Sequence, residues 1–462
     1  MDFSTLSFWV ITLPALLLYY FICRCIRGQQ QRERFSKYSL CLLSICLLAH
    51  ASILTVTIFL FVVLLAYFSC RYIRRASIKR KKLLLAILIF ILLMPLLYYK
   101  YSIFIVQDVL CLPWNTYRNV IIPIGISFYT FQIISFCIDT IKREQDIPKF
   151  IDYLNFCSFF PQIVAGPIER KDSLLPQMEH YTWKWNSSAV AHGFSYIILG
   201  LFFKMALADN LASVIDNGYQ GTNAFRVWAN NLMFGLRIYF DFAGYGLTAY
   251  GIAKALGVNI TLNFNSPYTS CNVTDFWRKW HISLTLWFRD YIYFAMGGSR
   301  TRFWWFNIII MFVISGIWHG AGWNFLIWGA IAGISMVLHR LYRKLDFPMP
   351  AFIAWGLTML TMMFTWMFFY ETDMGIVWKN LCTILTPSSY DLHDYLENAG
   401  HAHYILVSVL LSALVILVEF ISSKKYQDPY HIFLNPPVCG ILIFLICFLQ
   451  SHQQAQFIYF AF

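Results

Sequence analysis

Charged residues are scarce in this sequence. Only 13% of its 462 residues are Asp, Glu, Lys or Arg, whereas 59% are hydrophobic. A soluble chain of this length carries charge on about a quarter of its residues. Water is therefore not the main solvent of this chain, and we expect an integral membrane protein.

The sequence also lacks the alternation of apolar and polar residues that is typical of membrane barrel strands. Its apolar runs instead reach the roughly 20 residues that a helix needs to cross a bilayer, and they recur along the whole chain. We predict an all-α integral membrane protein, a polytopic bundle of about 11–12 helices. Because no Ser/Gly/Pro-rich linker and no sequence repeat interrupts the chain, we expect one membrane domain over residues 1–462. Its parts are N-terminal helices at 1–115, a core at 116–342, and C-terminal helices with an aromatic tail at 343–462.

Several familiar site patterns are absent. The 12 cysteines are scattered without a C-x-x-C pair or zinc-like spacing, so neither a disulfide framework nor a metal site is indicated. There is no G-x-S-x-G, H-E-x-x-H, P-loop or Rossmann glycine pattern, so the templates of soluble enzymes do not apply. The first apolar run, from Leu6 to Cys23, follows Asp2 rather than a basic segment and precedes no cleavage site, so we expect a retained helix.

Positive charge is concentrated at the ends of apolar runs. Two clusters comprise Arg24, Arg27, Arg32, Arg34 and Lys37, and then Arg71, Arg74, Arg75, Lys79, Arg80, Lys81 and Lys82. The positive-inside bias predicts that both clusters are cytoplasmic, with the N-terminus outside and two short helices turning near His50 and Ser52. Arg340, Arg343, Lys344, Lys424 and Lys425 predict further cytoplasmic turns, and the loop from Glu371 to His403 should lie outside. Topology accounts for these residues, so we expect no nucleic-acid partner.

Two apolar segments contain unusual residues. Pro161, Gly166 and Pro167 interrupt the run at 156–170, which predicts a re-entrant element, with a kinked helix followed by a cytoplasmic loop as the alternative. Asp241 lies in another long apolar run, and Arg237 precedes it by one helical turn. A carboxylate in lipid is costly, so we expect Asp241 to face the protein interior in a structural ion pair with Arg237.

Two histidines lie in apolar surroundings. Asn272 or Thr274 can cap a helix that begins near Asp275, which predicts one face carrying Trp277, His281, Leu284 and Phe288. A lone histidine on such a face is ordinarily a core residue. His319 lies near the middle of the apolar stretch 303–338, roughly 24 Å from its cytoplasmic end if that stretch is helical. An apolar setting favours the neutral imidazole, so His319 is a candidate acid/base catalyst or proton relay, with a structural hydrogen bond as the alternative.

Six segments together resemble one protein family. They are FPQIVAGPI at 160–168, YFDFAGY at 239–245, NFNSPY at 263–268, FWRKWHISLTLWFRDYIY at 276–293, GGSR at 297–300 and IWHGAGWNFLIWG at 317–329. In this order they resemble the membrane-bound O-acyltransferase family, and within it the bacterial branch that supplies acetyl groups for alginate and peptidoglycan O-acetylation. The resemblance implies helices around a central tunnel in the bacterial cytoplasmic membrane, with donor entering from the cytoplasm and acceptor from outside. Related D-alanyl exporters share W-F-R-D-Y but are not expected to continue M-G-G-S-R, which favours acetyl transfer.

The resemblance also implies roles for individual residues. His319 of W-H-G is the catalytic histidine, and His281 of W-H-I-S lies on the same tunnel. The C-terminal residues 456–462 resemble the aromatic hexapeptide of this branch, in which the tyrosine, here Tyr459, is proposed to receive the acyl group. Ala461 stands where a polar residue is common, and an interfacial anchor is the ordinary interpretation of such a tail.

These expectations combine into an acyl relay. His319 deprotonates an acceptor oxygen such as the Tyr459 phenol, and this oxygen attacks the carbonyl of the donor. The donor is acetyl-CoA or another acyl thioester, carried by CoA or by an acyl-carrier protein. We expect no bound cofactor. We expect Trp277, Trp318 and Asn324 to line the substrate site, with Asp241 in a supporting role. Gly297 and Gly298 with Arg300 and Arg302 form a candidate phosphate cradle, although interface anchoring is an equal alternative. The expected partners are membrane lipids, the donor and an extracytoplasmic acetyltransferase.

Other functions stay open at this stage. The acyl group could be D-alanine, or the acceptor a lipid or protein, because fold and chemistry can be shared while the substrate differs. A proton-coupled transporter in which His281, His319 and Asp241 form a relay is a further alternative, although no inverted repeat is visible.

Overall fold

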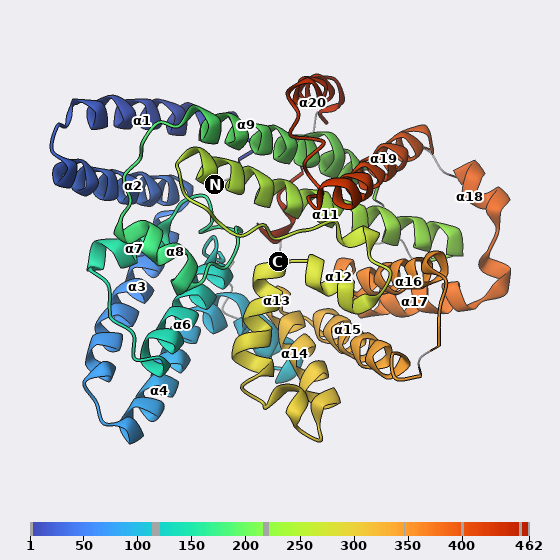
Figure 1. Ribbon diagram of the computed structural model, residues 1–462. Coiled ribbons are helices and arrows are strands. Elements are labelled where there is room, and N and C mark those ends of the chain that lie inside the picture. The colour runs from blue at the N-terminus through green and yellow to red at the C-terminus, as the bar shows by residue number, and fades with distance from the viewer. Residues whose placement is uncertain are drawn as a thin grey trace. The chain divides into compact units, whose positions relative to one another are not determined.

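The structure is a computed structural model that describes residues 3–112, 121–215, 221–345, 347–398, 402–451 and 455–460. Every regular element within these ranges is a helix, which confirms the predicted all-α class (Figure 1). Seven helical segments in the described ranges are long and apolar enough to cross a membrane: Leu6–Cys25, Ile53–Arg74, Ile78–Val109, Ser187–Val214, Trp323–Tyr342, Ala351–Tyr370 and Leu406–Tyr426. Three shorter apolar helices are Trp304–His319, Met374–Leu385 and Pro436–Leu449. The chain therefore has the composition of a multi-pass membrane protein.

The chain divides into two compact units. The first comprises Met1–Ile197 and Gly246–Leu262, and the second comprises Ile198–Tyr245 and Asn263–Phe462. Helices α9 (Ser187–Leu201) and α11 (Ala224–Ala255) contribute residues to both units.

The first unit contains the helices up to α9. They are α1 (Leu6–Cys25), α2 (Gln29–Ala51), α3 (Ile53–Arg74), α4 (Ile78–Leu96), α5 (Ser102–Phe104), α6 (Ile126–Lys142), α7 (Phe150–Ser158) and α8 (Lys171–Glu179), with π-helical turns at Leu97–Tyr101 and Ile105–Val109. Helices α3, α4 and α6 pack against one another (Figure 1). The predicted turn near His50 and Ser52 is confirmed, because Ser52 caps α3 by accepting the N–H of Thr55 at 3.2 Å. Helix α2 begins at Gln29, earlier than predicted, so it carries part of the first basic cluster.

The predicted break at 156–170 is present in the first unit. Helix α7 ends at Ser158, buried turns follow, and α8 begins at Lys171. The carbonyl of Phe156, near the end of α7, accepts the side-chain amides of Gln132 at 2.8 Å and Gln162 at 3.1 Å. These amides donate to a backbone carbonyl that would have had a backbone partner in a continuous helix. Irregular backbone in an apolar setting needs such replacement partners. A re-entrant path in the membrane stays a prediction.

The second unit contains the remaining helices. They are α10 (Asp209–Val214), α12 (Val273–Lys279), α13 (Ile282–Phe288), α14 (Trp304–His319), α15 (Trp323–Tyr342), α16 (Ala351–Tyr370), α17 (Met374–Leu385), α18 (Leu392–Asn398), α19 (Ala402–Tyr426) and α20 (Pro436–Leu449). π-Helical turns occur at Phe202–Ala208 and Arg289–Tyr293, and 3-10 turns at Pro267–Thr269, Gly298–Arg300, Pro387–Ser389 and Ile458–Phe460. The segment from Glu371 to His403, expected as a loop, is thus partly helical, and Asp373 caps α17 by accepting the N–H of Gly375 at 2.7 Å. Its placement outside stays a prediction, and residues 399–401 lie outside the described ranges.

Helices α14 and α15 form a closely packed pair in the second unit (Figure 1). A methyl group at Gly316 of α14 would overlap the carbonyl of Phe325 in α15, so only glycine permits this approach. The predicted apolar stretch 303–338 is therefore two helices, with α14 ending at His319 and α15 beginning at Trp323. The pairing fixes the end of α14 and hence the position of His319.

Candidate active site

His281 lies at a break between two short helices. Asn272 caps α12 by accepting the N–H of Asp275 at 2.8 Å, which confirms the predicted cap. The prediction of one helix aligning Trp277 with His281 is wrong, because α12 ends at Lys279 and His281 adopts the left-handed conformation with φ 41° and ψ 56°. That conformation costs a residue with a Cβ about 1 kcal/mol or more, so the surroundings must maintain it.

Asn263 maintains this break from the preceding loop. Its backbone carbonyl accepts the N–H of Ile282 at 2.9 Å, and its side-chain oxygen accepts the N–H of Ser283 at 3.2 Å. These are the first amides of α13, which have no partner within their own helix. The imidazole of His281 is 2% exposed, and its ring centroid lies 4.6 Å from that of Phe242 in α11. The loop N-F-N-S-P-Y thus contributes both acceptors for the amides that begin α13 directly after His281.

His319 is enclosed by aromatic rings at the end of α14. The residue is 4% exposed, and its ring centroid lies 4.9 Å from Trp318, 5.3 Å from Trp328 and 5.1 Å from Phe369. These rings come from α14, α15 and α16. They exclude water from most of the imidazole.

The C-terminal tail reaches this pocket. Tyr459, in the 3-10 turn Ile458–Phe460, places its hydroxyl oxygen 3.3 Å from Nδ1 of His319. The phenol donates in this contact when the imidazole proton is on Nε2. The Tyr459 ring lies 4.5 Å from Phe242 and 6.4 Å from both Trp318 and His281, measured between centroids. The structure therefore brings His319, His281, Trp318 and Tyr459 into one cluster, although their roles stay predictions. Ala461 lies outside the described residues.

A buried pair of charges fixes the tail through its backbone. Oδ2 of Asp241, which is 1% exposed, accepts the N–H of Ile458 at 2.7 Å. The ammonium of Lys204 donates to the carbonyl of Ala455 at 2.8 Å and lies 2.9 Å from Oδ1 of Asp241. Phe457, between the two anchored positions, stacks on Tyr245 at 4.9 Å. We call Lys204 and Asp241 the tail clamp.

The ion pair of Asp241 differs from the prediction. Its direct partner is Lys204, which also lies 2.8 Å from Asp209, rather than Arg237. Helical spacing pointed to Arg237, but Lys204 comes from a different helix and is itself 6% exposed. Sequence reasoning overlooked Lys204, although a cation within an apolar run marks a site of interest by the same argument as Asp241.

Three other residues that were predicted to contact substrate lie outside the cluster of His319, His281, Trp318 and Tyr459. Asn324 donates to the carbonyl of Phe368 at 3.0 Å and so joins the start of α15 to the end of α16. Arg300 and Arg302 are exposed. The side chain of Asn307 closes the turn that precedes them by donating to the carbonyls of Met296 at 3.2 Å and Gly298 at 3.0 Å. Their proposed contacts with substrate stay predictions.

A cavity of about 460 Å³ lies among α12, α13, α14 and α15. Its lining contains four arginines and a group of apolar side chains, namely Arg278, Arg289, Arg340, Arg343, Trp277, Ile308, Met311, Phe312 and Met336, together with Thr274, Thr285, Tyr293 and His339. Trp277 links this cavity to the histidine pocket, because its ring lies 5.8 Å from Trp328, which in turn lies 5.3 Å from His319.

Comparison with known sequences identifies the family. The family described as MBOAT, membrane-bound O-acyltransferase, matches residues 105–378, which include both histidines and Asp241. This chain belongs to that family. It is therefore a multi-pass membrane O-acyltransferase.

Individual relatives are similar over much of the chain. A peptidoglycan O-acetyltransferase of Helicobacter pylori is 30% identical over an alignment that covers 100% of this chain and 97% of that protein. A probable alginate O-acetylase of Azotobacter vinelandii is 32% identical over 67% of this chain and 63% of its own length. A teichoic acid D-alanyltransferase of Bacillus subtilis is 30% identical over 50% of this chain and 62% of its own length. These relatives confirm the resemblance to the bacterial O-acetylation branch.

Proposed function

We propose that this enzyme transfers an acetyl group from a cytoplasmic thioester, through Tyr459, to a cell-envelope polysaccharide on the other side of the bacterial cytoplasmic membrane. The observation that carries this proposal is the 3.3 Å contact between the Tyr459 hydroxyl and Nδ1 of His319 in a pocket of aromatic rings. A nucleophile within hydrogen-bond reach of a base is the arrangement that covalent catalysis requires.

The first transfer follows from that contact. The Tyr459 oxygen attacks the thioester carbonyl while Nδ1 of His319 takes the phenol proton. The carbon–sulfur bond then breaks, and the departing thiolate receives the proton from the imidazolium, so a thiol leaves and a tyrosine ester remains. In the second transfer an acceptor hydroxyl attacks the ester, His319 takes its proton, and the proton returns to the phenolate. Each step moves one proton and exchanges one acyl bond, so no further reactant is needed.

The cavity among α12 to α15 suits the donor. Its four arginines provide charge for the phosphates of CoA or of a carrier's phosphopantetheine, and its apolar wall suits the pantetheine chain. Among the described residues the indole N–H of Trp277 has no hydrogen-bond partner, so it can donate to an amide or thioester carbonyl of the donor. We therefore favour these arginines over Arg300 and Arg302 as the phosphate contacts, since neither of those lines the cavity.

The relatives support acetyl as the group and a polysaccharide as the acceptor. The peptidoglycan O-acetyltransferase matches the whole of this chain, tail included, at 30% identity, whereas two teichoic acid D-alanyltransferases match 50% and 73% of it at 30% and 26% identity. An extracytoplasmic acetyltransferase is the expected partner, because a tyrosine ester formed within this pocket needs a second enzyme to pass the acetyl group to a polymer.

The test uses purified enzyme in proteoliposomes with radiolabelled acetyl-CoA, to which the extracytoplasmic acetyltransferase and the polymer are added. We expect His319→Ala to abolish labelling of both protein and added polymer, and Tyr459→Phe to abolish labelling of the protein. Mass spectrometry of the C-terminal peptide should place one hydroxylamine-sensitive acetyl group on Tyr459 in the parent enzyme. His192→Ala, which changes an exposed histidine of the first unit, serves as the matched control and should retain activity.

The outcomes separate the steps of the proposal. Labelled polymer with Tyr459→Phe would show that the acetyl group passes directly to an external acceptor. That result would contradict the proposed tyrosine intermediate but not the role of His319 as the base. Full activity of well-folded His319→Ala would end the catalytic assignment itself.

A further inference from the structure

A second cavity lies in the first unit, and none of its lining residues belongs to the proposed acyl-transfer site. It has a volume of about 580 Å³ at the end of α3 and the loop after α6, and it is lined by Tyr67, Arg71, Arg74, Arg75, Asp146, Ile147, Pro148 and Lys149. Four of these side chains are cationic and one is anionic. A cavity with this surplus of positive charge is suited to an anion.

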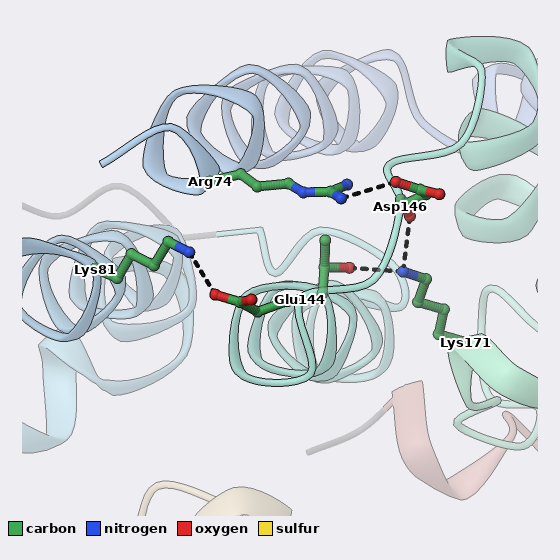
Figure 2. Close-up of polar contacts among 6 residues, drawn as sticks. Arg74, Lys81, Glu144, Asp146 and Lys171 are labelled. Carbon is green, nitrogen blue, oxygen red and sulfur yellow. Dashed lines mark hydrogen bonds and ion pairs between the residues drawn. The ribbon is translucent and has the colours of Figure 1, made fainter. Parts of the chain in front are cut away.

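The loop that forms one wall is fixed from several helices. Arg74 of α3 pairs with Asp146 at 2.8 Å, and Lys81 of α4 pairs with Glu144 at 2.7 Å (Figure 2). The buried ammonium of Lys171 also donates to the carbonyl of Asp146 at 3.1 Å (Figure 2). The wall is therefore preorganised, and a ligand need not order it on binding.

The remaining cations of the cavity are available for a ligand. Arg71, Arg75 and Lys149 are exposed and make no ion pair within the described part of the chain. The guanidinium of Arg71 lies 5.8 Å from the centre of the Tyr67 ring, whose hydroxyl donates to the carbonyl of Pro148 at 3.0 Å. The aromatic ring thus supports both Arg71 and the opposite wall.

The position of the cavity identifies the kind of anion. Helix α3 is a candidate membrane span that ends at Arg74, so the cavity lies where the hydrocarbon gives way to lipid head groups. Phe61, Leu64 and Phe68 are 57%, 40% and 61% exposed on α3, and their spacing continues to Arg71 and Arg75 on the same face. An apolar stripe that leads into a cationic cavity matches an amphipathic ligand, with acyl chains along the stripe and an anionic group at its end.

We propose that this cavity binds the head group of an anionic phospholipid, with the acyl chains lying along Phe61, Leu64 and Phe68 of α3. Basic pockets between helices at the cytoplasmic interface are typical sites for such head groups. This lipid site is separate from the acyl-transfer residues. None of its residues belongs to the cluster of His319, His281, Trp318 and Tyr459, to the tail clamp, or to the cavity among α12 to α15, which we call the donor cavity.

The test measures binding to the purified full-length enzyme in neutral detergent. Phosphatidylglycerol is titrated against phosphatidylcholine and against inorganic phosphate, and the apparent dissociation constants are compared. We expect phosphatidylglycerol to bind, and the combined change Arg71→Gln, Arg75→Gln and Lys149→Gln to weaken it roughly a hundredfold, at roughly fivefold per cation. The single change Arg71→Gln, at an exposed position, is the second variant and should weaken binding roughly fivefold.

A matched control removes the same charge outside the cavity. Lys79, Arg80 and Lys82 are exposed and none lines the cavity, so their combined change to Gln should leave the affinity for phosphatidylglycerol nearly unchanged. Equal weakening by both triple variants would show diffuse attraction to lipid and overturn the proposal. Binding of inorganic phosphate as tight as that of phosphatidylglycerol would overturn it in favour of a free-anion site, and phosphatidylcholine binding equally well would also overturn it.

Discussion

The tail clamp predicts the effect of a single isosteric change, Asp241→Asn. The carboxylate of Asp241 accepts the backbone N–H of Ile458 at 2.7 Å, one residue before the tyrosine. The change removes the charge of this acceptor and keeps its size. Lys204 keeps its pairing with Asp209 at 2.8 Å, so no buried cation loses all its counter-charge and the chain should still fold.

The expected magnitude follows from the lost contact. A hydrogen bond to a charged group contributes about 1.5–3 kcal/mol, which corresponds to roughly a 10- to 150-fold weaker docking of the tail. Because a detached tail takes Tyr459 away from His319, kcat should fall by about tenfold or more. The KM for acetyl-CoA should stay unchanged, since the donor cavity contains neither Asp241 nor Lys204.

Steady-state transfer from acetyl-CoA in proteoliposomes measures both constants. Glu419→Gln is the matched control, because Glu419 is a buried carboxylate of the same unit that accepts the Tyr239 hydroxyl at 2.7 Å and makes no contact with the described tail residues. Its kcat should remain near that of the parent enzyme. If folded Asp241→Asn keeps its kcat within about twofold, or if only its KM changes, then the clamp does not position the tyrosine.

Three further predictions concern other parts of the molecule. Gly316→Ala should destabilise the protein by about 1–3 kcal/mol, seen as a lower thermal midpoint, because the new methyl overlaps the carbonyl of Phe325; an unchanged midpoint would contradict this packing. A hydrogen bond from Lys81 lowers the pKa of Glu144 below its ordinary value of 4.5, so the pair stabilises the fold above that value and the contribution disappears as the pH falls through the lowered pKa. Glu144→Gln should therefore lower the thermal midpoint slightly near neutral pH and leave it unchanged in strong acid. Arg343→Gln should raise the KM for acetyl-CoA about tenfold with kcat unchanged, and an unaltered KM would exclude this arginine as a donor contact.

The features that the sequence predicted correctly depend on local signals. The cap at Asn272 follows from a polar side chain that satisfies an amide three residues later, and the turn near Ser52 was predicted from the basic clusters that flank its two helices. The break after Ser158 follows from proline and glycine within an apolar run. The signals for the cap and the break act within a few residues of chain, so the sequence alone contains them.

The features that were mispredicted depend on distant residues. Apolar periodicity favoured one helix through His281, but Asn263, far earlier in the chain, supplies the acceptors that begin a new helix after it. Spacing within α11 pointed to Arg237 as the partner of Asp241, whereas Lys204 arrives from another helix. Periodicity describes one helix at a time, and it cannot show which charge a second helix brings.

The way the tail is held explains why its tyrosine, rather than another of its aromatic rings, reaches the histidine. A short tail outside any long helix has backbone groups that need partners in an apolar interior. Asp241 and Lys204 supply an acceptor for the Ile458 amide and a donor for the Ala455 carbonyl, so they contact the backbone and do not select a side chain. Two anchored backbone atoms three residues apart fix the register of the segment. Phe457 is then directed onto Tyr245, and Tyr459 is directed onto His319. Charge inside the protein thus determines which ring contacts His319, and the aromatic contacts surround that ring with apolar side chains, as the proposed transfer through its hydroxyl requires.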